Sequence, residues 1–316
     1  MNQKGIGVSN LPNLKYKSIC KNGIDFNIMT VGSHGLGKTS FINGLLSTVI
    51  LQDTMENSDF HVTTCTVVEN EFKTNMTITE IDRLGDSDDN DKCWVHIVKY
   101  LHESYQDYLN KEQKNVRTLI RDKRVHVCFY FLEPNVDFIK PADLLSMKEI
   151  SKYCNLIPIV SKSDFLNERQ IQDCFDFLRN VIESNGITVF EENNPTRGDI
   201  TSFIPPFFVV CPDKHGSMTR NYQWGSIDIG NLVTNDLFRL RDKLINKNII
   251  DLIERTEEFY DKFRATVLSN IINKQASKNL NKDISNMQFF EDMSTEEKTL
   301  KDLRQRIIEK KNKMNK

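Results

Sequence analysis

The feature that most constrains this chain is a glycine-rich segment near its start. Residues 32–39 read Gly-Ser-His-Gly-Leu-Gly-Lys-Thr and match the pattern G-x-x-x-x-G-K-[ST]. The apolar stretch Ile24–Val31 precedes them, and Lys38–Ile50 places apolar residues at helical spacing. A strand, a glycine turn and a helix in this order predict a loop that cradles phosphate groups with backbone N–H groups and a helix N-terminus.

Each part of this loop has an expected role. The glycines let backbone N–H groups turn inward, Lys38 is expected to reach the β- and γ-phosphates, and the Thr39 hydroxyl is expected to bind Mg²⁺. We therefore expect the whole segment to contact a nucleotide, namely Gly32, Ser33, His34, Gly35, Leu36, Gly37, Lys38, Thr39 and Ser40.

The rest of the first two thirds alternates between strand and helix patterns. The predicted strands are Ile24–Val31, His61–Phe72, Asn75–Asp82, Val125–Leu132, Asn155–Val160 and Phe207–Cys211, with the second and third joined near Lys73 and Thr74. The predicted helices between them are Asp91–Leu109, Ala142–Tyr153 and Phe165–Ser184. This alternation predicts an α/β fold in which helices flank a mostly parallel sheet.

The pattern changes after Asp213. Residues 214–231 are rich in turn formers, and the helical segments Leu232–Asn246 and Asn248–Ile272 follow. Residues 273–294 are polar, and Thr295–Lys316 is a polar helix with a narrow apolar stripe. We expect an N-terminal arm at 1–23, a nucleotide-binding domain at 24–272, and a polar linker with a short coiled-coil-like tail at 273–316.

A second motif concerns the nucleotide base. Lys162 and Asp164 follow the predicted strand Asn155–Val160 in the sequence Ser-Lys-Ser-Asp. A carboxylate can accept hydrogen bonds from both N1–H and the exocyclic amine of guanine, whereas adenine presents no such pair on that edge. The stem of Lys162 can cover the ring. Although a K-x-D sequence alone is also compatible with a solvated loop, its place after a buried strand favours guanine.

Composition excludes several other classes of protein. The chain of 316 residues has 42 Lys+Arg and 44 Asp+Glu. This balance excludes a protein whose whole surface attracts nucleic acid by positive charge. Its seven cysteines are scattered, which fits reduced thiols in a cytoplasmic protein and excludes zinc-finger spacing. No apolar run approaches the roughly 18 residues needed to cross a bilayer.

Several short segments in order along the chain resemble one family. They are Gly7–Pro12, Gly32–Ser40, Gly85–Asn90 with Cys93 and Trp94, Arg124–Cys128, Lys140–Asp143 and Arg220–Gly225. In these segments the chain resembles the septins, GTP-binding cytoskeletal proteins that polymerise into filaments, from about Gly7 to Leu268. The resemblance implies a P-loop GTPase domain, a septin-specific element at about 213–271, and GTP or GDP with Mg²⁺ as ligands.

The resemblance also implies partners and positions. The partners would be other septin subunits, joined through two alternating interfaces, and the location would be the cytoskeleton, cell cortex or division site. Arg220 matches the arginine that lies against guanine, and Trp224 and His126 match positions at the nucleotide-side interface. The residue types alone also permit a buried core role for Trp224 and for His126. Lys15, Lys17 and Lys21 form a diluted version of a basic segment that binds acidic phospholipids, so weak membrane-surface binding is expected.

The chain departs from the family in its switch region. Where the family has D-T-P-G-x-G-D, this sequence has Glu-Ile-Asp-Arg-Leu-Gly-Asp at Glu80–Asp86. An ungapped match puts Arg83 at the glycine that meets the γ-phosphate, and a shifted match uses Asp82 and Gly85 instead. The catalytic threonine has only Thr63 and Thr64 as candidates.

Another departure lies near the base, where Val210-Cys211-Pro212 replaces Val-Gly-Ser. Pro212 removes a backbone donor, which would weaken the contacts with the base. With the switch so altered, GTP hydrolysis is expected to be slow or absent, and no catalytic residue is assigned. Two alternatives remain, a hydrolysing nucleotide-switch GTPase that acts as a monomer or dimer and an ATP-dependent phosphotransferase.

Overall fold

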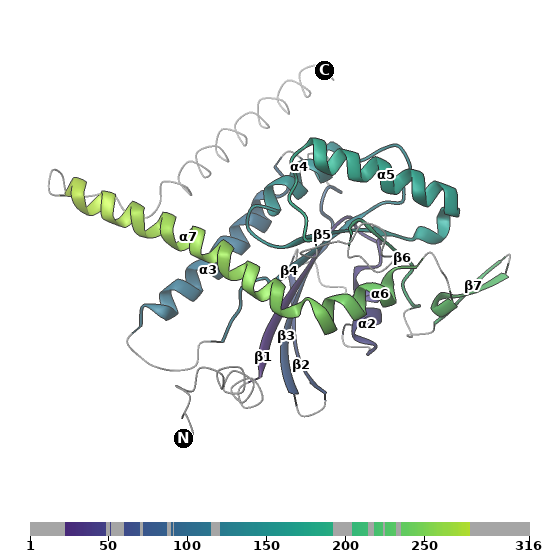
Figure 1. Ribbon diagram of the computed structural model, residues 1–316, viewed down its shortest axis with the longest axis horizontal. Coiled ribbons are helices and arrows are strands. Elements are labelled where there is room, and N and C mark those ends of the chain that lie inside the picture. Colours follow the sequence, from purple (N-terminus) through teal and green to yellow (C-terminus); the bar gives the residue numbers. More distant parts are fainter. Residues whose placement is uncertain are drawn as a thin grey trace, which may run out of the picture. The chain divides into compact units, whose positions relative to one another are not determined.

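A computed structural model gives the fold (Figure 1). It describes residues 23–48, 51, 60–69, 72–86, 90, 92–114, 121–191, 204–213, 218–223, 225–231 and 235–278. The chain divides into a first unit, residues 1–263, and a second unit, residues 264–316. The expected arm, apart from Gly23, and the expected tail helix Thr295–Lys316 lie outside the described residues.

Six strands form the main sheet in the order β2-β3-β1-β4-β5-β6. Five of them are parallel, and β2 runs antiparallel to β3 at one edge. The bounds are β1 Ile24–Val31, β2 Phe60–Glu69, β3 Phe72–Ile81, β4 Val127–Leu132, β5 Leu156–Ser161 and β6 Phe207–Val209. The predicted α/β fold with a mostly parallel sheet is confirmed.

Helices cover both faces of this sheet. They are α2 Lys38–Leu46, α3 Val95–Glu112, α4 Pro141–Ile150, α5 Glu168–Ser184, α6 Leu237–Arg241 and the part of α7 Ile249–Lys278 that belongs to the first unit. The sequence predicted one helix over Leu232–Asn246. In the structure α6 is followed directly by a π-helix, Asp242–Lys247, so the prediction of one regular α-helix is wrong. Residues 264–278 of α7 belong to the second unit. None of the helices among the described residues is long and apolar enough to cross a membrane.

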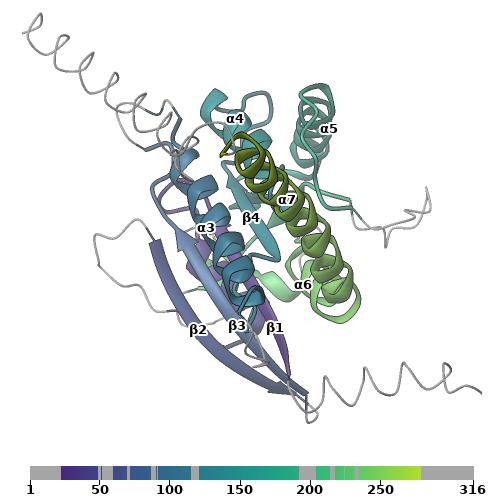
Figure 2. The same cartoon turned by 90° about the vertical axis from the view of Figure 1, so that its left-hand side faces the viewer.

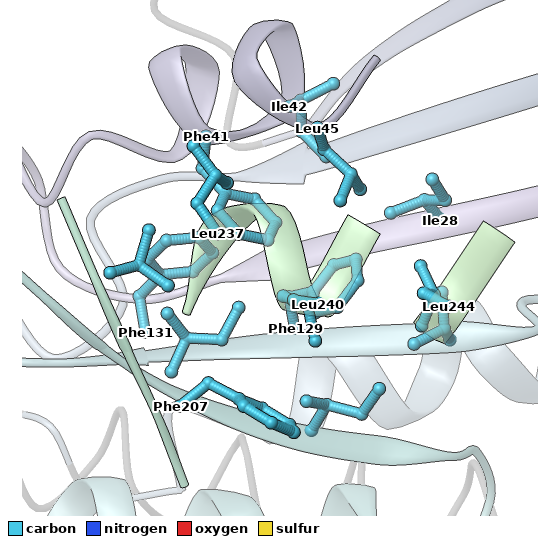
Figure 3. Close-up of a cluster of buried hydrophobic side chains, with 14 of the residues drawn as sticks. Ile28, Phe41, Ile42, Leu45, Phe129, Phe131, Phe207, Leu237, Leu240 and Leu244 are labelled. Atoms are coloured by element: carbon cyan, nitrogen blue, oxygen red, sulfur yellow. The ribbon is translucent and has the colours of Figure 1, made fainter. Parts of the chain in front are cut away.

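Successive side chains of β4 point to opposite faces of the sheet, and this explains why there are two apolar layers. Phe129 and Phe131 point to one face, where they pack with residues of α2, α6 and the π-helix (Figure 3). Cys128 and Tyr130 point to the other face, which α3, α4 and α5 cover. Figure 2 shows α3 lying over the strands on this second face. Because both faces are buried, the strand is an unbroken apolar run, as its sequence predicted.

A buried arginine joins α7 to this layer. Arg124, 3 % exposed, lies just before β4, and its guanidinium carbon is 3.8 Å from the ring centroid of Tyr108 in α3 and 4.9 Å from that of Tyr260 in α7. Its Nη2 is 2.7 Å from Asp122 Oδ2 and 2.7 Å from Glu257 Oε2. This cluster fixes the first part of α7 on the body of the domain.

Two local predictions need correction. The turn between β2 and β3 was expected near Lys73 and Thr74, but both residues are inside β3, opposite Val68 and Val67. The turn-rich segment 214–231 contains a hairpin formed by β7 Thr219–Tyr222 and β8 Gly225–Asp228, a separate two-stranded sheet. Its strands were hidden because they are short and largely exposed, so they lack an apolar alternation.

Candidate nucleotide-binding site

The carboxyl ends of the parallel strands bring the predicted motifs to one edge of the sheet. The segment 32–37 leaves β1, Asp82–Asp86 leaves β3, and Lys162 and Asp164 leave β5. In a sheet of this type, ligands bind in the crevice outside the carboxyl ends of the strands. The arrangement therefore places both predicted ligand motifs on the side where such a site belongs.

Two glycines of the loop are required by its geometry. A Cβ atom on Gly32 would lie 2.9 Å from the carbonyl oxygen of Phe131, so a side chain cannot fit between β1 and β4. Gly37 precedes α2 with φ of 82°, a left-handed conformation that glycine adopts without steric strain. The chain then enters α2 with its first N–H groups free of partners within the helix, as an anion site requires.

Lys38 is held inside the loop. Its Nζ donates to the carbonyl oxygens of Gly32 at 3.0 Å and Ser33 at 2.6 Å, and it lies 2.6 Å from Asp82 Oδ1. The side chain is 5 % exposed. Burial lowers the pKa of Lys38, and the hydrogen bond to Asp82 only partly offsets this effect. The lysine is thus positioned at the centre of the loop, with a carboxylate where an anion would bind.

Carboxylates after β3 occupy donors of the phosphate loop. Asp82 Oδ2 lies 2.5 Å from His34 Nδ1, and Asp86 Oδ2 accepts the backbone N–H of His34 at 2.7 Å. Burial alone would raise the pKa of Asp82, but the hydrogen bonds from Lys38 and His34 outweigh it and lower that pKa. The charge of Asp82 therefore stands in for a negative group at the loop.

The next contact concerns the expected metal ligand. Thr39 Oγ1 donates to Glu80 Oε1 at 3.1 Å, and Glu80 pairs with Thr30 in the β1–β3 ladder. Burial raises the pKa of Glu80, although the hydrogen bond from Thr39 lowers it in part. A hydroxyl and one carboxylate beside a phosphate site are the oxygen donors that Mg²⁺ takes, together with phosphate oxygens and water. The residues present fit the metal.

Two residues of the switch have left-handed backbone conformations, and each alignment assigns one of them to the family's glycine. The ungapped alignment puts Glu80 at the family's first aspartate, opposite Thr39, and Arg83 at the glycine. Arg83 has φ of 61°, in the left-handed region where glycine is the usual residue. Gly85, which the shifted alignment uses instead, has φ of 79°, so the backbone is compatible with both alignments.

The base motif contains an unsatisfied carboxylate oxygen. Asp164 lies in the 3-10 helix Ser163–Phe165, directly after β5, and its side chain is 5 % exposed. Its Oδ1 is buried and has no hydrogen-bond partner among the described residues, although buried polar atoms are usually paired. Lys162, which precedes it, has φ of 54°. An unpaired acceptor on a rigid turn is what a ligand with an N–H donor would complete.

The hairpin supplies two further groups to this carboxylate. The Tyr222 hydroxyl donates to Asp164 Oδ2, and Arg220 Nη1 lies 3.7 Å from the same oxygen. The predicted base residues Arg220 and Asp164 are therefore brought together. Tyr222 was missed, although it lies in the segment Arg220–Gly225 on which the family resemblance partly rests.

The substitutions near the base have a packing consequence. Cys211 and Pro212 are buried, and burial raises the pKa of Cys211 to about 12. The ring of Pro212 packs on α2, since a Cβ atom on Gly44 would lie 2.9 Å from its Cδ. The proline that removes a backbone donor therefore also requires a glycine in the helix after the phosphate loop.

The remaining expected residues are not found at this edge among the described residues. His126 is fully buried just before β4, at the opposite end of the strands, where its ring stacks on Phe26 and its Nδ1 accepts the N–H of Asn27 at 2.9 Å. This placement is that of a satisfied core histidine, the other role that the residue type permits. Thr63 and Thr64 lie within the β2–β3 ladder, opposite Ile78 and Thr77. Trp224 lies outside the described residues.

Comparison with known proteins gives a consistent result. The family model described as Septin matches residues 22–277. The chain is 39 % identical to "Cell division control protein 3" of Encephalitozoon cuniculi, over 98 % of this chain and 94 % of that protein. It is 31 % identical to "Neuronal-specific septin-3" of Bos taurus, over 84 % of this chain and 81 % of that protein.

A solved structure supports the fold. The septin GTPase domain from Chlamydomonas reinhardtii superposes with a TM-score of 0.61 at 21 % identity, covering 76 % of this chain and 98 % of that one. Together with the family model, which matches most of the sequence, these likenesses establish the family. The chain belongs to the septins, the family of cytoskeletal and cell-division proteins built on a GTPase domain.

Proposed function

We propose that this chain is a septin subunit that binds GTP or GDP with Mg²⁺, assembles with other septin subunits into hetero-oligomers or filaments, and hydrolyses GTP slowly or not at all. The observation that carries the nucleotide assignment is the buried, unpaired Oδ1 of Asp164. It lies on the turn after β5, at the same edge of the sheet as Lys38.

Nucleotide binding requires an exchange of anions at the loop. Asp82 lies beside the Lys38 ammonium, and Asp86 accepts the backbone N–H of His34. The β- and γ-phosphates would replace these carboxylates, and Thr39 with Glu80 would hold Mg²⁺, which neutralises phosphate charge. The donors of the loop are already oriented towards a negative group. Phosphate binding would therefore need the Asp82–Asp86 segment to move away, but it would not need the loop to rearrange.

The test of the nucleotide assignment is competition. Purified protein is loaded with a fluorescent GTP analogue and titrated with GTP, GDP and ATP in the presence of Mg²⁺, and the nucleotide that it retains through purification is identified by chromatography. We expect guanine nucleotides to displace the analogue and ATP to compete poorly. Equal competition by GTP and ATP would refute the assignment.

Hydrolysis is expected to be slow. Phosphoryl transfer is catalysed mainly by positioning and charge stabilisation, and these need a backbone N–H at the γ-phosphate and an oriented water. In the ungapped alignment Arg83 would place a long side chain beside that N–H, and the candidate threonines Thr63 and Thr64 are strand residues in the β2–β3 ladder. Single-turnover measurement should give a rate far below that of an activated signalling GTPase. A rate comparable to such an enzyme would contradict the prediction and favour the alternative of a hydrolysing switch.

Assembly is expected to depend on the nucleotide side of the domain. Trp224 belongs to the segment that resembles the family's interface, and truncation of an aromatic anchor often costs about 2 kcal/mol or more of binding energy. We expect Trp224→Ala to shift co-expressed septin assemblies towards smaller species in size-exclusion chromatography at low and high salt, with nucleotide binding retained. Unchanged assembly, or global unfolding of the variant, would contradict an interface role.

Location and membrane contact follow from the same proposal. A septin subunit of this kind acts in the cytoplasm at the cytoskeleton, cell cortex or division site. Lys15, Lys17 and Lys21 would add only weak attraction to acidic phospholipids, at about 1 kcal/mol per charge near the surface. No nucleic-acid partner is proposed.

A further inference from the structure

The β7–β8 hairpin meets the domain at the base-recognition carboxylate. Tyr222 is the last residue of β7, and its hydroxyl donates to Asp164 Oδ2. Arg220, two residues earlier on the same side of the strand, approaches the same oxygen at 3.7 Å. Two side chains of one strand therefore converge on one oxygen of a single buried carboxylate.

The two oxygens of Asp164 have different surroundings. Oδ2 receives the Tyr222 hydroxyl, whereas Oδ1 is buried without a partner among the described residues. A carboxylate whose one oxygen is held cannot rotate freely about its last side-chain bond, so the other oxygen keeps a fixed direction. Each oxygen has two lone pairs, so Oδ2 can still accept a second hydrogen bond.

The hydroxyl is suited to remain a donor. Burial raises the pKa of Tyr222, and the hydrogen bond to Asp164 raises it further, so the phenol stays protonated. Hydrogen bonds to an ionised acceptor are stronger than those between neutral groups. The contact is therefore a substantial restraint on the carboxylate and on the hairpin that carries the tyrosine.

We propose that Tyr222 is a positioning residue for guanine recognition, which fixes Asp164 so that the carboxylate can receive both N–H groups of the base edge. The inference rests on the proposed binding of guanine nucleotides. Tyr222 acts through Asp164 and need not touch the nucleotide. Because the restraint is mutual, base binding at Asp164 also stabilises the hairpin contact.

Inosine triphosphate is the ligand that isolates this effect. It keeps N1–H but lacks the exocyclic amine, so it uses one hydrogen bond of the pair. A carboxylate that is correctly oriented gains from both donors of guanine, whereas a freely rotating one loses part of the second. The ratio of GTP to ITP affinity therefore reports the orientation of Asp164 rather than the general integrity of the site.

The experiment compares wild-type protein with Tyr222→Phe. GTP affinity should fall about three- to tenfold, less than for direct loss of a hydrogen bond to a charged group, because Tyr222 acts through Asp164. ITP affinity should fall less, so that the GTP:ITP ratio drops by about twofold or more. Tyr153→Phe is the matched control, because Tyr153 precedes β5 at the end away from Asp164. It should leave both affinities unchanged.

A second measurement uses the wild type alone and needs no variant. Amide hydrogen exchange in residues 219–222 should slow more with saturating GTP than with saturating ITP, because the two contacts at Asp164 support each other. An unchanged GTP:ITP ratio in Tyr222→Phe, or equal loss of both nucleotides, would overturn the inference. If wild-type protein binds ATP as well as GTP, the proposed function fails instead, and this is visible before any variant is made.

Discussion

Asp164→Asn is expected to weaken GTP binding roughly 10- to 100-fold and to improve binding of xanthosine triphosphate, because an unpaired buried group costs about 1–3 kcal/mol and the new amide donates where the carboxylate accepted. In the structure Asp164 Oδ1 is buried and unpaired, while Oδ2 is held by Tyr222. The Tyr222 hydroxyl can donate to the new amide oxygen, which leaves the NH₂ group directed at the base. Xanthine presents a carbonyl oxygen there, so the preference should reverse.

The reversal is the part of this result that a simple loss of structure cannot imitate. Affinities for GTP, XTP and ATP are measured by competition, with thermal unfolding recorded for each variant. Asp176→Asn is the matched control, because Asp176 is exposed on α5 and its recorded partner is Gln172 on the same helix. If Asp164→Asn weakened GTP without any gain for XTP, the carboxylate would not be the group that meets the base.

The strand and loop framework was predictable because it depends on local patterns. The predicted strand Ile24–Val31 has the observed bounds of β1, and α2 begins at the predicted Lys38. Both result from a run of apolar residues ended by glycines whose conformations other residues avoid. The same reasoning located the turn at Lys162 and Asp164, because parallel strands direct the loops at their carboxyl ends to one edge of the sheet.

The contacts between these motifs could not be predicted, because they join residues far apart in the sequence. The sequence presents Asp82 only as a position in an alignment, whereas its ion pair with Lys38 crosses from one strand end to the next. Likewise, the contact from Tyr222 to Asp164 depends on a hairpin whose short, exposed strands have no apolar pattern. Such contacts require the three-dimensional register of the sheet.

Arg124 and His126 show the limit of matching residues to a family by sequence alone. Both lie in one matched segment, and the match gives His126 a position at the nucleotide-side interface, whereas its residue type also permits a buried core role. The structure buries both just before β4, where the ring nitrogen of His126 accepts a hydrogen bond from the backbone N–H of Asn27. Their environment results from the neighbouring Asp122, which Asp25 holds from β1, and from Glu257 of α7, and these two are distant in the chain.

The largest effect on stability is expected from Arg124. Arg124→Met should lower the free energy of unfolding by about 3–5 kcal/mol, because removing one partner of a buried ion pair leaves the other charge with only His126 beside it. Asp122 is that partner, since it keeps only 17 % of its side chain exposed, whereas Glu257 is half exposed and adds little. Urea denaturation measures the change, and a loss below about 1 kcal/mol would contradict it.

A double-mutant cycle separates this charge effect from lost packing on Tyr108 and Tyr260. Asp122→Asn combined with Arg124→Met should recover part of the loss, because the variant no longer buries an isolated carboxylate. Arg179→Met is the matched control: Arg179 pairs with Glu183 and Glu191 at a partly exposed site and should change stability by about 1 kcal/mol or less. If the double variant were as unstable as the sum of the two single variants, packing rather than charge would explain the effect.

The pH dependence of the free energy of unfolding gives an independent test of this ion pair. Burial alone would raise the pKa of Asp122, but the hydrogen bonds from His126 and Arg124 outweigh it and hold that pKa well below its usual value. A carboxyl group of this kind stabilises the fold above its unfolded pKa of about 3.9, and its contribution is lost as the pH falls from there through the folded pKa. The difference in stability between wild type and Arg124→Met should therefore be largest near neutral pH and shrink below about pH 4. A difference that stayed constant down to about pH 3 would show that the ion pair with Asp122 is not what Arg124 contributes.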